Sequence, residues 1–356
     1  MEIGRPDFDT PQSIKKAAIR ALQEGKVHYT ANAGIQELKE SISRKLAVEN
    51  QFSVDPEKGV VITIGCKEAI LDTMLAYINL GDEVLVPDPS WLEYQNIVKL
   101  AGGVPVPVAL REEEEFLLNP DDVRECVTSK TKMLIVNSPQ NPTGAVLPKS
   151  YLQALAEIAN AFDLIVLSDE IYEKLIYDDA KHVCFASLPG MAERTIVING
   201  FSKAYAMDGW RLGYAAGEEH LIQPILKAHQ YNTSCSTSFA QYGAVSAYEG
   251  SQESVRAMVN AFDQRRKLII SRLQQMDGVH CVVPKGAFYV FPSFKSLGMS
   301  SKELAIALLE QAHIACVPGE AFGNQGQGYL RMAYSASYDQ LEQAMDRLAH
   351  FLQKYR

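Results

Sequence analysis

The sequence lacks several features that would assign it to a specialised class. Its uninterrupted apolar runs are strand-sized, well short of the ~20 residues that cross a bilayer. The first residues are polar and contain no apolar core of a signal peptide. The six cysteines are scattered, with no CxxC pair and no metal-ligand spacing. We therefore expect reduced core thiols in a soluble, cytoplasmic protein, with no bound metal and no membrane partner.

The sequence also has fewer basic than acidic residues. The chain has 34 lysine and arginine residues against 43 acidic residues, a formal net charge of −9, and no basic run. Such a chain repels phosphate backbones, so we expect no nucleic-acid partner. Hydrophobic residues make up 47% and charged residues 22% of the 356 residues, as in an ordinary globular protein of two or three domains.

What the chain does contain is an alternating pattern of strands and helices between residues 60 and 216. This pattern predicts an α/β sheet with crossover helices. Several of the strands are apolar on both faces, which is typical of strands inside a parallel sheet. The expected strands are residues 60–64, 83–86, 104–108, 133–136, 164–167, 195–198 and 212–215, with helices over residues 67–78 and 148–161.

The two flanks have a different pattern. Thr10-Pro11 predicts a helix that has Thr10 as its N-cap and stops at Gly25. A long amphipathic helix is expected over residues 253–276, before a mixed α+β pattern. Its expected strands are residues 279–283, 287–291, 315–317 and 328–333, and its helices residues 301–312 and 338–352. We therefore expect a large domain at 28–250 and a smaller α+β domain formed by 1–27 and 251–356.

Residues with distinctive chemistry follow five of the expected strands. Ligands of open α/β sheets bind at the carboxyl ends of the strands, so we expect these residues to converge. Each alone has an ordinary explanation, such as a turn glycine, a helix cap or a surface lysine, but their co-location favours a binding site. They are Gly65, Cys66 and Lys67; Trp91; Asn141; Asp169 and Tyr172; and Ser202 and Lys203.

Together these groups match one small, anionic, electrophilic ligand. A helix N-terminus, the Ser202 hydroxyl and Arg211 suit a phosphate dianion. Lys203 can form a Schiff base with an aldehyde, and Asp169 can keep a pyridine nitrogen protonated. With an aromatic side chain to stack on the ring, this set describes pyridoxal 5′-phosphate.

Five motifs resemble the class I/II aminotransferases, which use this cofactor. Residues 200–213, from Gly200 to Gly213, are similar to the cofactor-attachment signature at each constrained position. Four further motifs occur in the family's order, so the resemblance covers essentially the whole chain and ends at residues 328–331. It implies fold type I of the pyridoxal-phosphate enzymes, with a mostly parallel seven-stranded sheet. The four motifs are residues 4–11, 29–34, 141–144 and 168–172.

The resemblance also implies a role for each matched residue. Lys203 matches the Schiff-base lysine and Asp169 the partner of the pyridinium nitrogen, while Arg331 matches the arginine that holds the substrate α-carboxylate. The freed Lys203 amine would carry the substrate's Cα proton. Around the cofactor ring, Tyr172 and Asn141 would donate hydrogen bonds to O3′ and Trp91 would stack on the ring face. The phosphate would be held by Gly65, Cys66, Ser202 and Arg211, and Tyr29 would reach the phosphate in the neighbouring subunit. The substrate would also be bordered by Gly4, Trp91 and Asn141.

The implied activity is a ping-pong transfer of an amino group from an L-amino acid to a 2-oxo acid, in a homodimer with shared sites. We expect 2-oxoglutarate as acceptor and aspartate, or a broad or aromatic amino acid, as donor. Lys67 follows the phosphate-binding turn and is expected either to meet the distal carboxylate of a dicarboxylic substrate or to add to phosphate binding.

Alternatives remain at this point. A carbon–sulfur β-lyase or a cyclopropane-carboxylate synthase could use the same fold and cofactor. An ATP-driven protein is disfavoured: residues 164–170 resemble a Walker-B strand, but no G-x-x-x-x-G-K-[ST] loop occurs. The sequence departs from the family at two places. Cys66 stands where serine, threonine or glycine is usual. The segment before Gly4 is shorter than in relatives, so an N-terminal arm is either missing from the numbered chain or absent.

Overall fold

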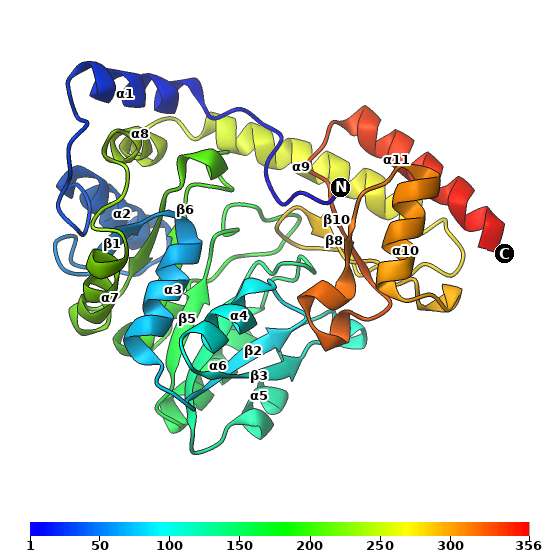
Figure 1. The fold of residues 1–356 in the computed structure, drawn as a ribbon, viewed down its shortest axis with the longest axis horizontal. Helices are drawn as coiled ribbons and strands as arrows, with labels where there is room; N and C mark the ends of the chain where they lie inside the picture. The colour runs from blue at the N-terminus through cyan, green and yellow to red at the C-terminus, as the bar shows by residue number, and fades with distance from the viewer. Residues whose placement is uncertain (356) are drawn as a thin grey trace.

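The computed structural model describes residues 1–355 and contains a seven-stranded sheet and a three-stranded sheet, each packed against helices (Figure 1). The large sheet has the order β1-β7-β6-β5-β4-β2-β3, in which only β7 runs antiparallel to its neighbours. The predicted mostly parallel seven-stranded sheet is confirmed. Its strands are β1 (Val60–Thr63), β2 (Glu83–Asp88), β3 (Val104–Ala109), β4 (Thr131–Asn137), β5 (Ile165–Asp169), β6 (Thr195–Gly200) and β7 (Gly213–Ala216).

Helices cover both faces of this sheet, because alternate residues of each strand are apolar and point to opposite sides. Val61, Ile135 and Leu167 belong to the core on one side, and Ile62, Leu134 and Val166 to the cores on the other. The first face packs against α3 (Gly65–Tyr77), α4 (Glu93–Leu100) and α7 (Glu219–Asn232). The second packs against α2 (Gln36–Glu49), α5 (Pro120–Cys126), α6 (Lys149–Ala161) and α8 (Ser238–Glu249).

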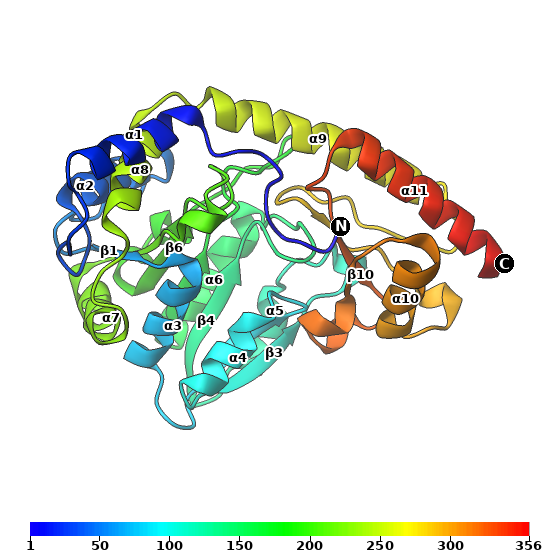
Figure 2. The same cartoon turned by 45° about the horizontal axis from the view of Figure 1, so that its top comes forward.

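The C-terminal part forms a separate core around the small sheet. Strands β8 (Tyr289–Val290), β10 (Leu330–Ala333) and β9 (Val317–Pro318) pair antiparallel in that order. The long α9 (Glu253–Leu273) runs from the large sheet to this region, where α11 (Tyr338–Leu352) lies beside it (Figure 2). The shorter helix α10 (Ser301–Ala307) continues into the π-helical turn Leu308–Ala312.

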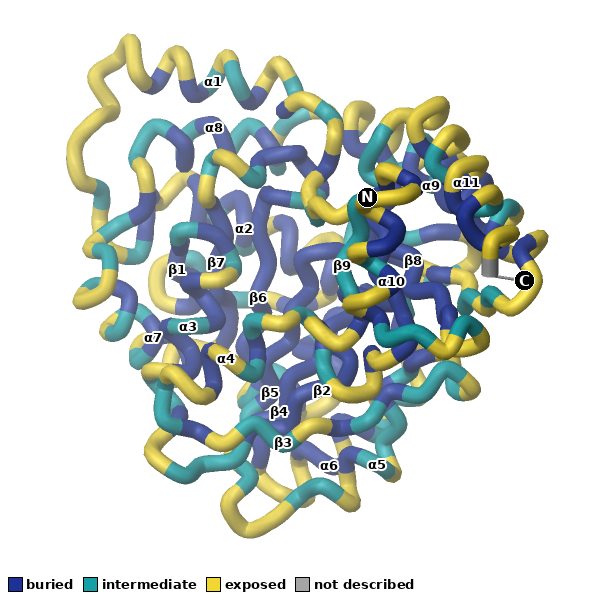
Figure 3. Tube along the Cα trace, turned by 45° about the vertical axis from the view of Figure 1, so that its right-hand side comes forward, coloured by how far each residue is buried: buried dark blue, intermediate teal, exposed yellow. Residues whose placement is uncertain are grey.

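The N-terminal segment contacts both parts. Residues before α1 (Gln12–Gln23) pack on the small sheet, where Ala333 N donates to Met1 O and Arg265 pairs with Asp7. Helix α1 itself lies along α8, with its outer surface exposed (Figure 3). The domain boundaries proposed from the sequence stay a prediction.

Three local expectations were wrong. Thr10 does not cap α1: its hydroxyl donates to Ala206 O, and Pro11 precedes the first helical residue. Residues 279–283 form no strand, because their backbone pairs only through a bridge between His280 and Ser293. The expected strand at 287–291 shortens to β8 because Ala287 has a left-handed backbone, with φ of 59°.

Two further findings concern the cysteines and the expected lack of a membrane-spanning helix. All six cysteines are free, as expected, but only Cys184 is fully buried; the other five are partly exposed. Among residues 1–355, none of the helices is long and apolar enough to span a bilayer.

Candidate active site

A cavity of about 330 Å³ lies where the carboxyl ends of the central strands meet the small sheet and the N-terminal segment. The structure brings eleven of the thirteen predicted site residues to its wall, and Gly65 lies directly behind it. Only Tyr29 lies elsewhere. The eleven are Gly4, Cys66, Lys67, Trp91, Asn141, Asp169, Tyr172, Ser202, Lys203, Arg211 and Arg331.

Strand register explains why residues distant in sequence meet here. In the parallel pairing of β4 with β5, Asn137 is the direct partner of Asp169, and both are the last residues of their strands. The Asn137 amide donates to Asp169 O, and its Oδ1 accepts from the backbone of Asn141. The Asn137 side chain therefore holds the Asn141 loop against the end of β5.

Asp169 is a buried carboxylate held at both oxygens. Tyr94 from α4 donates its hydroxyl to Oδ2 over 2.5 Å, and Ile171 N donates to Oδ1 over 3.2 Å. Burial raises the pKa of Asp169 to about 6, and these two hydrogen bonds counter only part of that effect. A cationic ring nitrogen beside it would relieve the cost of burying this charge.

The start of α3 forms an anion cradle. Gly65 has φ of 74°, which turns the chain from β1 into the helix, and a Cβ there would lie 2.6 Å from Arg211 Nη2. Gly213 leaves similar room, since a Cβ would lie 2.5 Å from Cys66 N. Burial raises the pKa of the Cys66 thiol, so the thiol stays neutral and adds no negative charge at the start of α3. Free helical N–H groups beside a guanidinium suit a phosphate.

The Lys203 amine lies inside the cavity, bonded to Gly4 O over 2.5 Å and 5.7 Å from the ring centres of both Tyr172 and Phe288. The Tyr172 hydroxyl lies 2.9 Å from that of Tyr289. In the described chain no acidic side chain pairs with Lys203. Its one short contact is a backbone carbonyl, which a substrate or cofactor can replace.

Arg331 is a buried cation without a carboxylate partner in the described residues. Its Nη1 donates to Asn141 Oδ1 (3.2 Å) and its Nη2 to Glu2 O (2.7 Å), while Nε is buried with no hydrogen-bond partner. The guanidinium lies 4.6 Å and 4.9 Å from the ring centres of Tyr289 and Phe322. A buried guanidinium whose donors are not all used is suited to bind an anion.

At the cavity mouth, Lys67 is half exposed. Its Nζ pairs with Glu93 Oε1 over 2.7 Å and lies 5.5 Å from the Trp91 ring centre. The Trp91 ring in turn packs edge-to-face on Tyr94, with centroids 5.2 Å apart. Lys67 thus contacts the aromatic wall of the cavity through Trp91 and is held there by Glu93.

Sequence reasoning missed two tyrosines that line the cavity. Tyr94 could have been found, since it lies three residues after Trp91, in the turn that leads into α4, and its backbone N–H donates to Trp91 O. Tyr289 carried no such signal. It reaches the cavity only because the small sheet is packed against the large one, and a Cβ on Gly4 would lie 2.5 Å from its hydroxyl.

Comparison with known proteins agrees with this geometry. The model of the family "Aminotransferase class I and II" matches residues 1–348. The chain is 48% identical to an aspartate aminotransferase of Pyrococcus abyssi, over 99% of this chain and 91% of that protein, and 45% identical to aromatic-amino-acid aminotransferase 2 of Thermococcus litoralis, with the same coverages. The crystal structure of an aromatic aminotransferase from Pyrococcus horikoshii superimposes with a TM-score of 0.97 at 46% identity, covering 99% of this chain and 95% of that one.

The chain therefore belongs to the class I and II aminotransferases and has fold type I of the pyridoxal-phosphate enzymes. It is a transaminase that depends on pyridoxal phosphate, and the β-lyase alternative is not favoured. The cavity fits that cofactor: Gly65 and Gly213 leave the room that an anion at the start of α3 requires, and Asp169 offers a buried carboxylate in the wall of the same cavity.

Proposed function

We propose that this enzyme transfers the amino group of aspartate to 2-oxoglutarate, giving oxaloacetate and glutamate, with the predicted site residues in the roles their positions suit. The observation that carries the amino-acid assignment is Arg331, a buried guanidinium that lines the same cavity as Lys203 and whose Nε has no hydrogen-bond partner. A planar, bidentate cation is suited to an α-carboxylate. Gly4 and Asn141 then border that carboxylate.

When bound, pyridoxal phosphate supplies an aldehyde that joins amines and a ring that accepts electrons. Gly65, Cys66, Ser202 and Arg211 hold its phosphate, while Trp91 stacks on its ring and Tyr172 and Asn141 donate to O3′. Asp169 keeps the ring nitrogen protonated. The Lys203 Nζ is the group that would join the cofactor's aldehyde, and as a free amine it would take up and release the proton at the substrate's Cα.

The dicarboxylate preference rests on Lys67. The amine stands at the mouth of the cavity and is paired with Glu93, so a negative group already occupies the place where a distal carboxylate would lie. One relative named for aspartate and one named for aromatic amino acids are almost equally similar to this chain. An aromatic donor is therefore the second candidate, since Trp91 and Tyr94 line the same wall.

The test is Lys67→Ala, assayed with aspartate and with phenylalanine. A hydrogen bond to a charged group contributes about 1.5–3 kcal/mol, so kcat/KM for aspartate should fall by about 10–150-fold while that for phenylalanine stays nearly unchanged. The matched control is Glu93→Gln, which removes the competing carboxylate and should keep or improve the reaction of aspartate. Equal losses for both amino acids with Lys67→Ala would assign Lys67 to the cofactor and refute the dicarboxylate proposal.

We further propose a cytoplasmic homodimer with shared sites. Tyr29 is 90% exposed and lies outside the cavity of its own chain, as expected of a residue that reaches a neighbouring subunit. On α1, the apolar side chains of Ile19 and Leu22 are about half exposed and line a groove with Trp210 and Phe239. A second copy covering this groove would bury them.

A further inference from the structure

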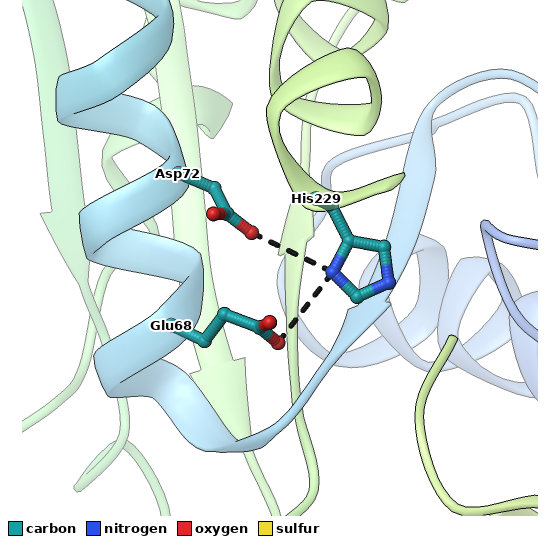
Figure 4. A group of neighbouring side chains, drawn as sticks. All are labelled: Glu68, Asp72 and His229. Atoms are coloured by element: carbon teal, nitrogen blue, oxygen red, sulfur yellow. Dashed lines mark ion pairs between the residues drawn. The ribbon is translucent and has the colours of Figure 1, made fainter. Parts of the chain in front are cut away.

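A second cluster of ionisable side chains lies between α3 and α7, outside the cofactor cavity. Glu68 and Asp72 stand one turn apart on α3, and His229 faces both from α7 (Figure 4). The His229 Nδ1 atom lies 3.5 Å from Glu68 Oε2 and 3.5 Å from Asp72 Oδ2. One ligand atom from each residue lies within 4.8 Å of the others, so all three converge on one point.

Two of the three atoms that face this point lack partners. The side chains of Asp72 and His229 are fully buried, and neither Asp72 Oδ2 nor His229 Nδ1 has a hydrogen-bond partner. Figure 4 shows the Nδ1 atom directed between the two carboxylates. A buried polar atom left unpaired is destabilising, so a group bound between these three side chains would stabilise the fold.

The charge of the cluster also points to a cation. In the described part of the chain, the two carboxylates pair with no lysine or arginine, only with His229. A protonated His229 still leaves one negative charge uncompensated, whereas a divalent cation with neutral His229 brings the buried total to zero.

The distances match a particular kind of cation. Zinc bonds of about 2.0–2.2 Å to nitrogen and oxygen place neighbouring ligands of a tetrahedron roughly 3.3–3.5 Å apart. Hydrogen bonds would be shorter than the 3.5 Å observed. We propose that Glu68, Asp72 and His229 form a structural site for zinc or a similar first-row divalent cation, with water as fourth ligand. The imidazole disfavours calcium and magnesium, which prefer oxygen ligands.

The outer oxygens of both carboxylates are held by residues at the end of α7. Thr233 Oγ1 donates to Glu68 Oε1, and Asn232 Nδ2 donates to Asp72 Oδ1 over 3.3 Å. Such supporting bonds orient carboxylates toward a metal. The Ile64 N–H group also donates to Glu68 Oε2. A bound cation would thus join α7 to the first turns of α3, directly behind the anion cradle at Gly65.

The site can be tested on the full-length, cofactor-loaded protein without an affinity tag. After removal of metal by a chelator, equilibrium dialysis against zinc chloride should load one zinc per chain, measured by mass spectrometry of the metal. His229→Gln and Asp72→Asn should each weaken zinc binding by more than about 100-fold, more than the loss of a supporting residue causes. Zinc should also raise Tm of the wild type but not of His229→Gln.

Two histidine variants serve as controls. His220→Gln changes an exposed histidine on the same helix α7. His182→Gln changes a second cluster, in which Lys45 already pairs with Glu173. Both should keep one zinc per chain. Circular dichroism and the cofactor's absorbance check that each variant is folded.

X-ray absorption at the zinc edge of the wild type provides a readout that needs no variant. We expect only nitrogen and oxygen neighbours; sulfur neighbours would mean that a cysteine holds the metal and would overturn the proposal. Zinc retained by a folded His229→Gln variant would overturn it as well. So would a wild type that binds none, in which case the cation of the cluster is the proton on His229.

Discussion

The Tyr94 hydroxyl lies 2.5 Å from Asp169 Oδ2 and ties the short helix α4 to the end of β5. Both side chains are buried at the floor of the cavity, and the backbone of Ile171 occupies the other carboxylate oxygen. The position of the Asp169 carboxylate is therefore fixed before a cofactor binds. Its ionisation depends on the same contact, since the Tyr94 hydrogen bond lowers a pKa that burial raises to about 6.

Tyr94→Phe should weaken cofactor binding and shift its pH dependence upward. Without the hydroxyl, the pKa of Asp169 rises further, so the carboxylate that holds the ring nitrogen forms only at higher pH. A hydrogen bond to a charged group contributes about 1.5–3 kcal/mol, which corresponds to a shift of about 1–2 pH units. Titration of the wild-type and Tyr94→Phe apoproteins with pyridoxal phosphate between pH 5 and 9 measures this shift. An unchanged pH profile would show that Tyr94 only packs.

Asp169→Asn should stabilise the apoprotein at neutral pH. Because burial raises the pKa of Asp169 in the folded chain from 3.8 to about 6, the native state binds its proton more tightly than the unfolded state. Stability is thus lost as pH rises through this interval, by about 3 kcal/mol in total. Asparagine carries no charge and avoids that loss.

Urea unfolding of the wild-type and Asp169→Asn apoproteins tests the predicted gain in stability. The advantage of Asp169→Asn should be small at pH 4 and reach its full value at pH 7. The same substitution should abolish transamination in the loaded enzyme, because a neutral amide cannot keep the ring nitrogen protonated. A variant that is less stable than wild type at pH 7 would contradict the sign of the effect.

Lys203→Ala should lose more than about a thousandfold in transamination rate while still binding the cofactor through its phosphate and ring contacts. Removing a general base alone costs about 10²–10⁴-fold, and here the covalent link is lost too. Single-turnover assays with aspartate measure the rate, and dialysis measures retention of pyridoxal phosphate. The assignment fails if the variant keeps more than about a thousandth of the wild-type rate.

Tyr29→Phe should weaken cofactor binding about tenfold without altering the fold, if its hydroxyl reaches the phosphate of a neighbouring subunit. Sedimentation should find the active enzyme at twice the mass of the 39.4 kDa chain. His28→Ala, a change to the exposed neighbour, is the matched control and should leave cofactor affinity unchanged. A fully active monomer would exclude shared sites.

The sequence by itself determined most of the residues that line the cavity and most of the sheet that positions them. Strands such as 133–136 and 164–167 are apolar on both faces, so their burial in a parallel sheet follows from composition alone. Because parallel strands bring their carboxyl ends to one edge, Asn141, Asp169 and Lys203 were predictable as neighbours.

Only the tertiary structure decided what depends on packing between distant segments. Thr10, a typical helix cap in sequence, instead bonds to Ala206 O, 196 residues away, because the N-terminal segment crosses the loop after Lys203. Tyr289 joins the site through the placement of the small sheet, and His229 meets Glu68 and Asp72 because α7 packs along α3. Sequence periodicity shows which face of a helix is buried, but not which helix will cover it. The partners of buried polar groups are therefore set by long-range packing.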